Sequence, residues 1–154
     1  MTDPARHADA APDDGGPAAG TADGADPGML ELAERLFDAA RSGDTGMLRT
    51  YLDAGIPATL TNAAGDSLLM LAAYHGHANL AGLLIERGAE VNTLNDRGQS
   101  PLAGAVFKGY PEVLRVLVAA GADPDSGNPS ARAAAQYFQR PELLALLGEE
   151  PQKP

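Results

Sequence analysis

Two histidines, His75 and His77, are the side chains of this sequence best suited by type to bind a metal or to transfer a proton. They are two positions apart, whereas two histidines that share one metal ion on a helix are typically four positions apart. The spacing therefore argues against a metal site. No set of nucleophile, base and orienting group accompanies them, so we expect no catalytic residues.

An acidic loop, Gly121-Ala-Asp-Pro-Asp-Ser-Gly-Asn128, is superficially similar to a calcium-binding loop. An EF-hand requires a glutamate six residues after its glycine, and that position is Ala133. We interpret the loop as a connection between helices. The sequence lacks the glycine-rich patterns that hold phosphates. These are GxxxxGK followed by Ser or Thr, and GxGxxG before a helix. We therefore expect no metal, no cofactor and no enzymatic activity.

The composition excludes further classes of site and partner. Without cysteine, disulfides and cysteine-based zinc sites are ruled out. The formal net charge of -10 disfavours nucleic acids and anionic membranes and favours a basic or weakly charged protein partner. No apolar run approaches the roughly 18 residues of a membrane span, and residues 1–28 lack the apolar core of a signal peptide. We expect a cytoplasmic protein, and the scarcity of lysine (Lys108 and Lys153 alone) indicates a GC-rich bacterial gene.

Apolar periodicity divides the chain into one folded region and two tails. Residues 1–28 are almost wholly Ala, Asp, Gly, Pro and Thr, with six aspartates against Arg6. Such a segment cannot bury enough apolar surface to offset its chain entropy, so we expect a disordered acidic tail. This tail is either a solubilising segment or an acidic arm that docks on a basic partner. Residues 29–147 should form the folded domain and residues 148–154 a flexible C-terminal tail.

Three series of glycines recur with one fixed, 33-residue period. The series are Gly43, Gly76 and Gly109, then Gly55, Gly88 and Gly121, and finally Gly65 and Gly98. A fixed period of this length predicts a repeat array, in which each unit buries its apolar face against its neighbours.

Each unit is expected to fold as a helix, a tight turn, a second helix and a loop. In the third unit, Ser100 is placed to cap the first helix, and Pro101 suits its first position. Gly109 ends that helix, Pro111 begins the next, and Gly121 is placed to end it in the left-handed conformation. Helices of about eight to ten residues are marginal alone and depend on packing. The expected core sets are Leu69, Ala72, Leu80, Leu83 and Leu84, and one period later Leu102, Ala105, Val113, Val116 and Leu117.

These units resemble the ankyrin repeat family. The second unit, Asn62-Ala-Ala-Gly-Asp-Ser-Leu-Leu-Met-Leu-Ala-Ala-Tyr-His-Gly-His77, follows the family's Gly, Thr-Pro-Leu-His, Ala-Ala and Gly-His pattern. Leu83-Leu-Ile-Glu-Arg-Gly-Ala-Glu-Val-Asn92 matches the family's closing motif, and the third unit supplies Gly98-Gln-Ser-Pro-Leu102. The resemblance implies an all-α ankyrin repeat solenoid of about four helix-turn-helix repeats, two full and two capping. It also implies short hairpin loops near Thr59–Asp66 and Val91–Gln99.

Some positions depart from the family pattern. Met70 and Ala103 replace the usual histidine of Thr-Pro-Leu-His, so the hydrogen bonds that it makes between units should be missing. Pro111 recurs as Pro141, three positions earlier than the period requires, so the last unit is out of step and should act as an end cap. His77 matches the family's turn histidine, which implies a structural role.

In the family, loop tips and first helices line a concave groove that binds partners. Carried over by position, the candidate partner-binding residues are Arg41, Asp66, Tyr74, His75, Arg97, Gln99, Phe107 and Lys108. Tyr74 and Phe107 are equivalent, and aromatic side chains near Arg or Lys often dominate binding energy. The alternative is that these two rings only cover the helix surface between units. Tyr110, in the turn, is expected to be a packing residue.

The sequence thus predicts a protein that acts by binding rather than by catalysis. The first hypothesis is an adaptor or regulatory protein, monomeric on its own, that binds a partner protein through the concave groove. The alternative is an inhibitor or immunity-type protein that blocks a co-encoded enzyme or toxin. An enzyme is the third hypothesis, and the missing catalytic site argues against it.

Overall fold

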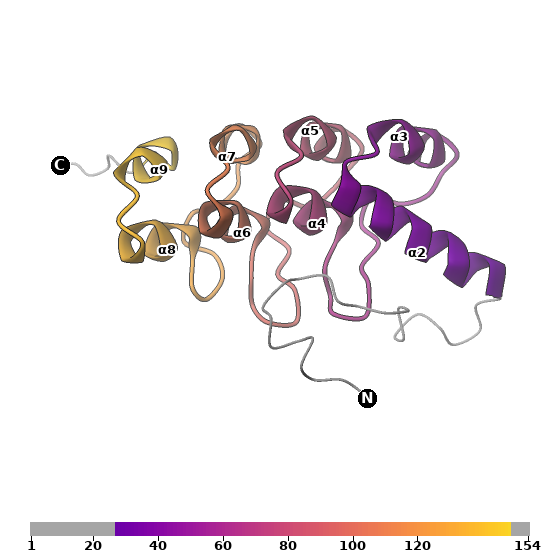
Figure 1. Ribbon diagram of the computed structural model, residues 1–154, viewed down its shortest axis with the longest axis horizontal. Coiled ribbons are helices and arrows are strands. Elements are labelled where there is room, and N and C mark those ends of the chain that lie inside the picture. The colour runs from indigo at the N-terminus through magenta and orange to yellow at the C-terminus, as the bar shows by residue number, and fades with distance from the viewer. Residues whose placement is uncertain (1–26, 149–154) are drawn as a thin grey trace.

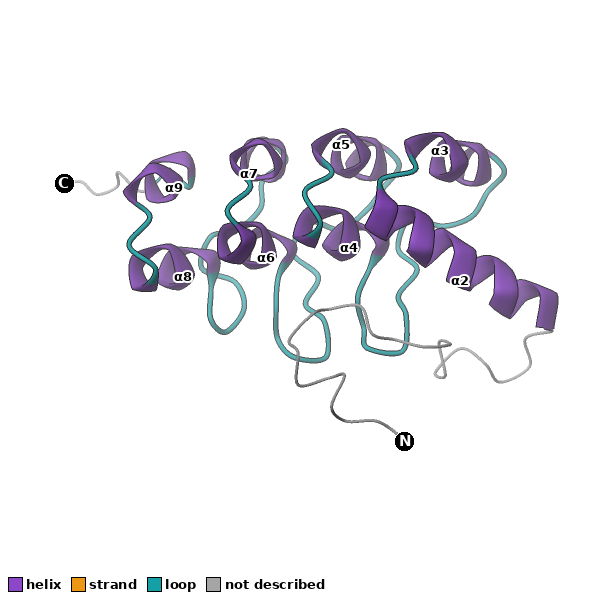
Figure 2. Ribbon diagram, viewed as in Figure 1, coloured by secondary structure: helices purple, strands orange, loops and turns teal. Residues whose placement is uncertain are grey.

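The computed structural model describes residues 27–148, which form eight helices and no regular strand (Figure 1 and Figure 2). Their bounds are α2 (Pro27–Ser42), α3 (Thr45–Asp53), α4 (Leu68–Tyr74), α5 (Ala78–Glu86), α6 (Pro101–Lys108), α7 (Pro111–Ala119), α8 (Ala131–Tyr137) and α9 (Pro141–Leu146). The first helix of every unit lies in one row, and the second helix lies in the row beside it. The all-α repeat architecture expected from the sequence is confirmed.

The first helix is longer than the repeat pattern suggested. α2 has 16 residues, whereas the other helices have 6 to 9. It begins at Pro27, two residues before the expected start at Met29, because proline suits the first turn of a helix. The expected disordered tail lies, except for its last two residues, outside the described part of the chain, and so do residues 149–154.

A serine caps the first helix of three successive units. The hydroxyls of Ser67, Ser100 and Ser130 accept hydrogen bonds from backbone N–H groups three residues on, at 2.9, 3.0 and 3.0 Å. Each such cap stabilises its helix by about 1 kcal/mol. Ser67 and Ser100 are one full period apart, whereas Ser130 comes three positions early, so the shortened step of the last unit falls before its first helix.

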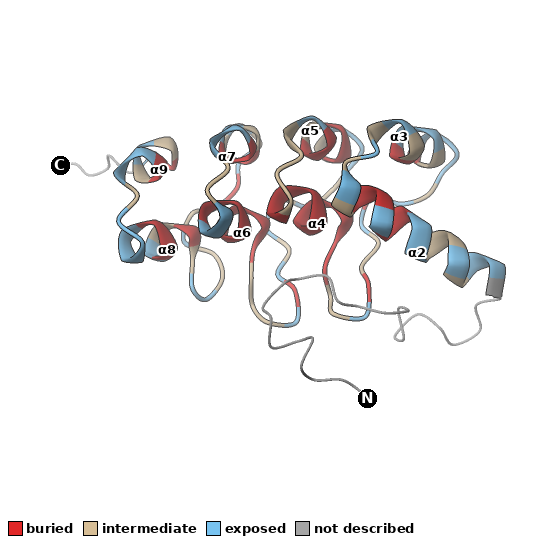
Figure 3. Ribbon diagram, viewed as in Figure 1, coloured by how far each residue is buried: buried red, intermediate tan, exposed pale blue. Residues whose placement is uncertain are grey.

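The hydrophobic core lies between the two rows of helices (Figure 3). The expected core leucines and Val113 are buried, while Val116 is only partly buried. Ala72 on α4 and Ala105 on α6 are fully buried, and α6 packs against both α4 and α8. Their small side chains allow the first helices of neighbouring units to approach closely.

The two expected hairpin loops are confirmed, and an asparagine organises each. The Asn62 side chain accepts hydrogen bonds from the N–H groups of Ala64 and Asp66, and the Asp66 carbonyl accepts one from the Asn62 N–H. Asn95 repeats this arrangement with Arg97 and Gln99. Asparagine favours such turns because its side chain satisfies backbone N–H groups two to four residues on.

Loops of neighbouring units are tied together by polar contacts. The Asn95 side-chain amide donates to the Asp66 carboxylate at 2.7 Å, and the Asp96 N–H donates to the Ala64 carbonyl at 3.0 Å. Met70 and Ala103, which stand where the family has histidine, are buried instead. These loop contacts therefore connect units that lack the family's histidine.

In each of the first three units, the glycine between the two helices is covered by a side chain from the following unit. The His77 ring covers Gly43, the Tyr110 ring covers Gly76, and the Arg140 guanidinium covers Gly109. His77 also places its Nε2 2.7 Å from the Arg41 carbonyl. The structural role of His77 and the packing role of Tyr110 are thus confirmed.

Candidate protein-binding surface

Four aromatic side chains form a continuous row across three first helices. Tyr74 ends α4, Phe107 lies near the end of α6, and Tyr137 and Phe138 lie at the end of α8. The Tyr74 and Phe107 rings are stacked, with centroids 6.5 Å apart and planes 11° apart. Phe138 meets Phe107 edge to face at 5.7 Å and Tyr137 at 5.0 Å. We call Tyr74, Phe107, Tyr137 and Phe138 the aromatic row.

The aromatic row is buried at one end and exposed at the other. Tyr74 is 7 % exposed, whereas Phe107 is 50 %, Phe138 42 % and Tyr137 79 % exposed. Contiguous apolar surface of this kind marks interaction sites, because isolated monomers seldom leave large rings clustered in water. Tyr74 is therefore the buried base of the row, and the other three rings are exposed to solvent.

A cavity of about 530 Å³ opens beside the aromatic row, between α6 and α8. Both small side chains and aromatic rings line it. Its described lining consists of Tyr74, Gln99, Ala103, Gly104, Phe107, Pro129, Ala133, Ala134, Tyr137 and Phe138. The cavity is therefore apolar and carries no ionisable carboxylate or cation among these residues. We call it the cap pocket.

A cation lies at the edge of the aromatic row. The Lys108 ammonium is 4.8 Å from the centroid of the Tyr74 ring. Such a cation–π contact contributes about 0.5–1 kcal/mol at an exposed site. On the other side, His75 meets the Tyr74 ring edge-on with centroids 5.4 Å apart. The structure thus brings together five of the residues singled out by sequence, Tyr74, His75, Gln99, Phe107 and Lys108.

The remaining sequence candidates lie elsewhere. Arg41, in the last turn of α2, is paired with Asp38 at 2.5 Å, and Arg97 lies partly buried in the second hairpin loop. Asp66 is fully buried, and its carboxylate accepts the bond from Asn95 that ties the loops together. The structure therefore places Asp66 in the framework of the repeat stack and not on the partner-binding surface where the sequence analysis put it.

Tyr137 and Phe138 are the binding candidates that the sequence analysis missed. The 33-residue step from Phe107 leads to Arg140, which covers Gly109 in the turn. The 30-residue step that relates Pro111 to Pro141 leads instead from Phe107 to Tyr137 and from Lys108 to Phe138. The shortened step was visible in the sequence, and carrying it onto the groove positions would have identified both rings.

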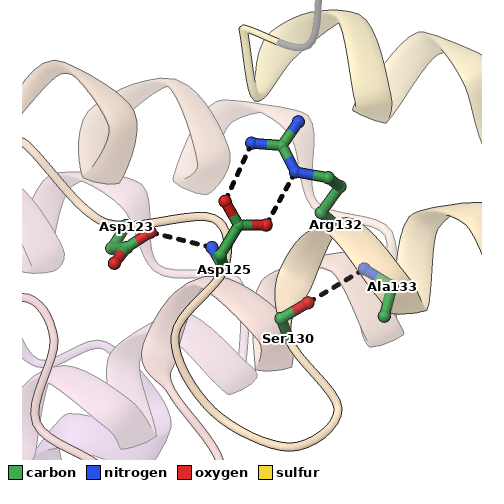
Figure 4. A network of polar contacts seen from close by, with 5 residues as sticks. All are labelled: Asp123, Asp125, Ser130, Arg132 and Ala133. Atoms are coloured by element: carbon green, nitrogen blue, oxygen red, sulfur yellow. Dashed lines mark hydrogen bonds and ion pairs between the residues drawn. The ribbon is translucent and has the colours of Figure 1, made fainter.

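The acidic loop before α8 is a structural connection (Figure 4). The Arg132 guanidinium donates to both carboxylate oxygens of Asp125, at 2.8 and 3.3 Å, and the Asp123 carboxylate accepts from the Asp125 N–H at 2.9 Å. The hydrogen bond from Arg132 holds the pKa of Asp125 below its ordinary value. Within residues 27–148, no group of three or more His, Asp or Glu side chains is placed to hold a metal ion.

A stack of paired helices in two rows, repeated along the chain, defines a helical repeat protein. The model of the family described as ankyrin repeats (3 copies) matches residues 36–128, which is more than half of the chain. The chain belongs to the ankyrin repeat family.

A curated ankyrin repeat protein of Pseudomonas aeruginosa strain PAO1 is 51 % identical to this chain over 53 residues. The matched stretch covers 34 % of this chain and 31 % of that protein. The similarity thus spans about a third of the relative. None of the described helices is long and apolar enough to cross a membrane.

Proposed function

We propose that this protein is an adaptor or regulatory protein that binds a partner protein through the first-helix surface of its repeat stack. The observation that carries the proposal is the aromatic row, in which the exposed rings of Phe107, Phe138 and Tyr137 follow one another from the buried Tyr74 ring. Aromatic side chains bury a large area while losing few rotamers, so they often dominate interface energies. Ankyrin repeats generally act as protein-protein interaction modules, which agrees with this proposal.

The proposed surface combines the residues that the sequence suggested with the two rings of the cap. Phe107, Lys108, Tyr137 and Phe138 are its exposed centre. Tyr74, His75 and Gln99 line its edges, and Arg97 and Arg41, which lie apart from this cluster, are kept as outlying contacts of the same partner. Asp66 is left out because its carboxylate is buried. The protein is proposed to act in the cytoplasm, as a monomer until it meets its partner.

Capture from a native lysate tests this proposal. Tagged full-length chain is compared with the double variant Phe107→Ala/Tyr137→Ala, which shortens two exposed rings. The matched control is Glu86→Ala/Arg115→Ala, which shortens two exposed side chains on the second helices. A partner that binds the chain and the control but not the aromatic variant supports the proposal. A partner lost only in the control variant would place the binding surface on the second helices.

The captured partner also separates the adaptor hypothesis from the inhibitor or immunity hypothesis. If the partner is an enzyme or toxin, its activity is measured with and without a stoichiometric amount of this protein. Unchanged activity supports an adaptor that tethers its partner. Loss of activity that is restored by Phe107→Ala/Tyr137→Ala supports an inhibitor that acts through the same surface.

A further inference from the structure

The cap pocket has an apolar lining and enough room to accept an apolar side chain. Its volume of about 530 Å³ falls within the roughly 300–1,000 Å³ of typical ligand pockets. The hollow exists because α6 and α8 present Ala103, Gly104, Ala133 and Ala134 where larger residues would fill the space. Phe107 and Phe138 then stand beside the hollow as exposed walls.

Apart from Met1, the two end segments of this sequence lack large apolar side chains that could fill the pocket. Residues 1–26 and 149–154 contain no Leu, Ile, Val, Phe, Tyr or Trp. An apolar cavity gains little from small or charged occupants, because burial is worth about 25 cal/mol per Å² of apolar area. Neither of these two segments is therefore the apolar occupant that the pocket favours.

Two cations, Lys108 and Arg140, lie at the turn that follows the wall residue Phe107. Lys108 follows the wall residue Phe107, and its ammonium lies over the Tyr74 ring. Arg140 lies against Gly109, the residue after Lys108, with its Nη1 2.8 Å from the position of an added Cβ. Among the described residues, no carboxylate forms an ion pair with either cation. No described Asp or Glu lines the pocket.

This local charge is opposite to that of the chain as a whole. The net charge of -10 favours a basic partner over long distances, whereas the edge of the pocket attracts an anion at close range. Between exposed charges, salt screens interactions beyond about 10 Å. The charges next to the pocket therefore determine which partner residues are favoured beside the side chain that enters the pocket.

We propose that the cap pocket binds a short acidic-hydrophobic segment of a partner protein. An aromatic or branched aliphatic side chain fills the hollow between α6 and α8, and a neighbouring Asp or Glu pairs with Lys108 and Arg140. Gln99, at the pocket wall, offers its side-chain amide to the backbone of the segment; its Oε1 already accepts from Asn95. The inference rests on the proposed function, and it adds the chemistry of the partner.

Synthetic peptides test the chemistry directly. Three fluorescent peptides in a Gly/Ser frame carry Phe flanked by Asp, Phe flanked by Lys, or Ala flanked by Asp. Their binding to the full chain is measured by fluorescence anisotropy at about 0.1 M salt, where interactions beyond about 10 Å are screened. The Asp-flanked Phe peptide should bind tightest, and each of the other two should bind on the order of tenfold more weakly. Equal binding of the two Phe peptides, or tighter binding of the Lys-flanked one, would overturn the acidic part of the proposal.

Protein variants locate the site. Ala133→Trp fills the pocket from an exposed position on α8 and should abolish binding of the Asp-flanked Phe peptide. Ala145→Trp, at an exposed position on α9, is the matched control and should leave binding unchanged. Lys108→Glu should reverse the preference between the two Phe peptides. Binding that survives Ala133→Trp, or that Ala145→Trp reduces equally, would show that the pocket is not the site.

Failure of this inference and failure of the proposed function give different results. If no peptide binds but a partner protein is still lost in Phe107→Ala/Tyr137→Ala, the surface is right and the pocket chemistry is wrong. If neither peptides nor partner depend on these residues, both proposals fail. Light scattering tests whether a second copy of this chain occupies the pocket. If the chain forms dimers and Ala133→Trp dissociates them, the acidic-segment proposal is overturned.

Discussion

The ring of Tyr74 is stacked on that of Phe107, one repeat period further along the chain, with their planes only 11° apart. The two residues occupy equivalent positions in neighbouring units, so the repeat itself aligns the rings. Their surroundings nevertheless differ. Tyr74 is 7 % exposed and Phe107 is 50 % exposed, although both line the cap pocket. Equivalent residues can therefore have different roles: Tyr74 packs inside the stack, whereas Phe107 is exposed for contact with a partner.

This inequality predicts different costs for removing the two rings. Tyr74→Ala should lower the free energy of unfolding by about 3 kcal/mol, since it leaves a cavity in contact with Phe107 and Gly104. Phe107→Ala should cost less than about 1.5 kcal/mol, because half of its ring is already in water. Urea denaturation followed by circular dichroism measures both. Equal costs would mean that the two rings are buried to the same extent in solution.

The turn glycines provide a second test, because two of them differ in their surroundings. Gly43 and Gly55 both have positive φ, at 79° and 106°. A Cβ on Gly43 would lie 2.6 Å from Nδ1 of His77, whereas a Cβ on Gly55 meets nothing within 4 Å. Gly55→Ala should cost about 1 kcal/mol for the left-handed conformation alone, and Gly43→Ala should cost more because His77 must also move.

Chemical denaturation of the two alanine variants measures this difference. Repeating both substitutions in a His77→Ala background is the control, and there the two costs should converge. If Gly43→Ala remains the more costly substitution in that background, contact with His77 is not its cause.

A further pair of glycines isolates the effect of backbone conformation, because both have room for an added Cβ. Gly121 follows α7 with φ of 93°, Gly82 lies inside α5, and an added Cβ meets no atom within 4 Å at either position. Gly121→Ala should destabilise by about 1 kcal/mol, and Gly82→Ala should stabilise by a similar amount, since alanine favours a helix. Thermal unfolding of the two variants against the parent chain gives the signs. The same sign for both would contradict the positions of the two glycines relative to their helices.

The ion pair in the acidic loop predicts a small pH effect. Because the hydrogen bond from Arg132 lowers the folded-state pKa of Asp125 from its ordinary 3.8, the pair stabilises the fold above that value. The stabilisation is lost as the pH falls below 3.8 and through the lowered pKa. Both side chains are partly exposed, so the effect on stability is small and the pKa itself is the better readout.

Arg132→Met should return the pKa of Asp125 to its ordinary range, as followed by NMR titration of the carboxyl carbon. Arg115→Met is the control, because it removes an ion pair with Glu112 on another unit. A pKa of Asp125 that does not rise in Arg132→Met would show that Arg132 is not the cause of the lowered value.

Local signals explain how much of the fold could be predicted from the sequence. Serine caps, Pro111 and the glycines past each helix act within a few residues, so they marked most helix ends correctly. The start of α2 was missed because Pro27 precedes the first apolar residue of the pattern. Exposure is harder to predict, since it depends on the neighbouring unit. Asp66 is buried and bonded to Asn95 of the next loop, and no residue near Asp66 in the sequence predicts that contact.

The functional prediction compares the exposed rings with exposed side chains on the opposite row of helices. Phe107→Ala/Tyr137→Ala should weaken partner binding by about thirtyfold or more, equivalent to about 2 kcal/mol, because truncated interface aromatics commonly cost that much. The thermal midpoint should fall by only a few degrees, since both rings are at least half exposed. Glu86→Ala/Arg115→Ala, on the second helices, should leave binding within about twofold. Isothermal titration calorimetry with the captured partner measures both variants. Normal binding by the aromatic variant, with loss in the control, would assign the working surface to the second helices.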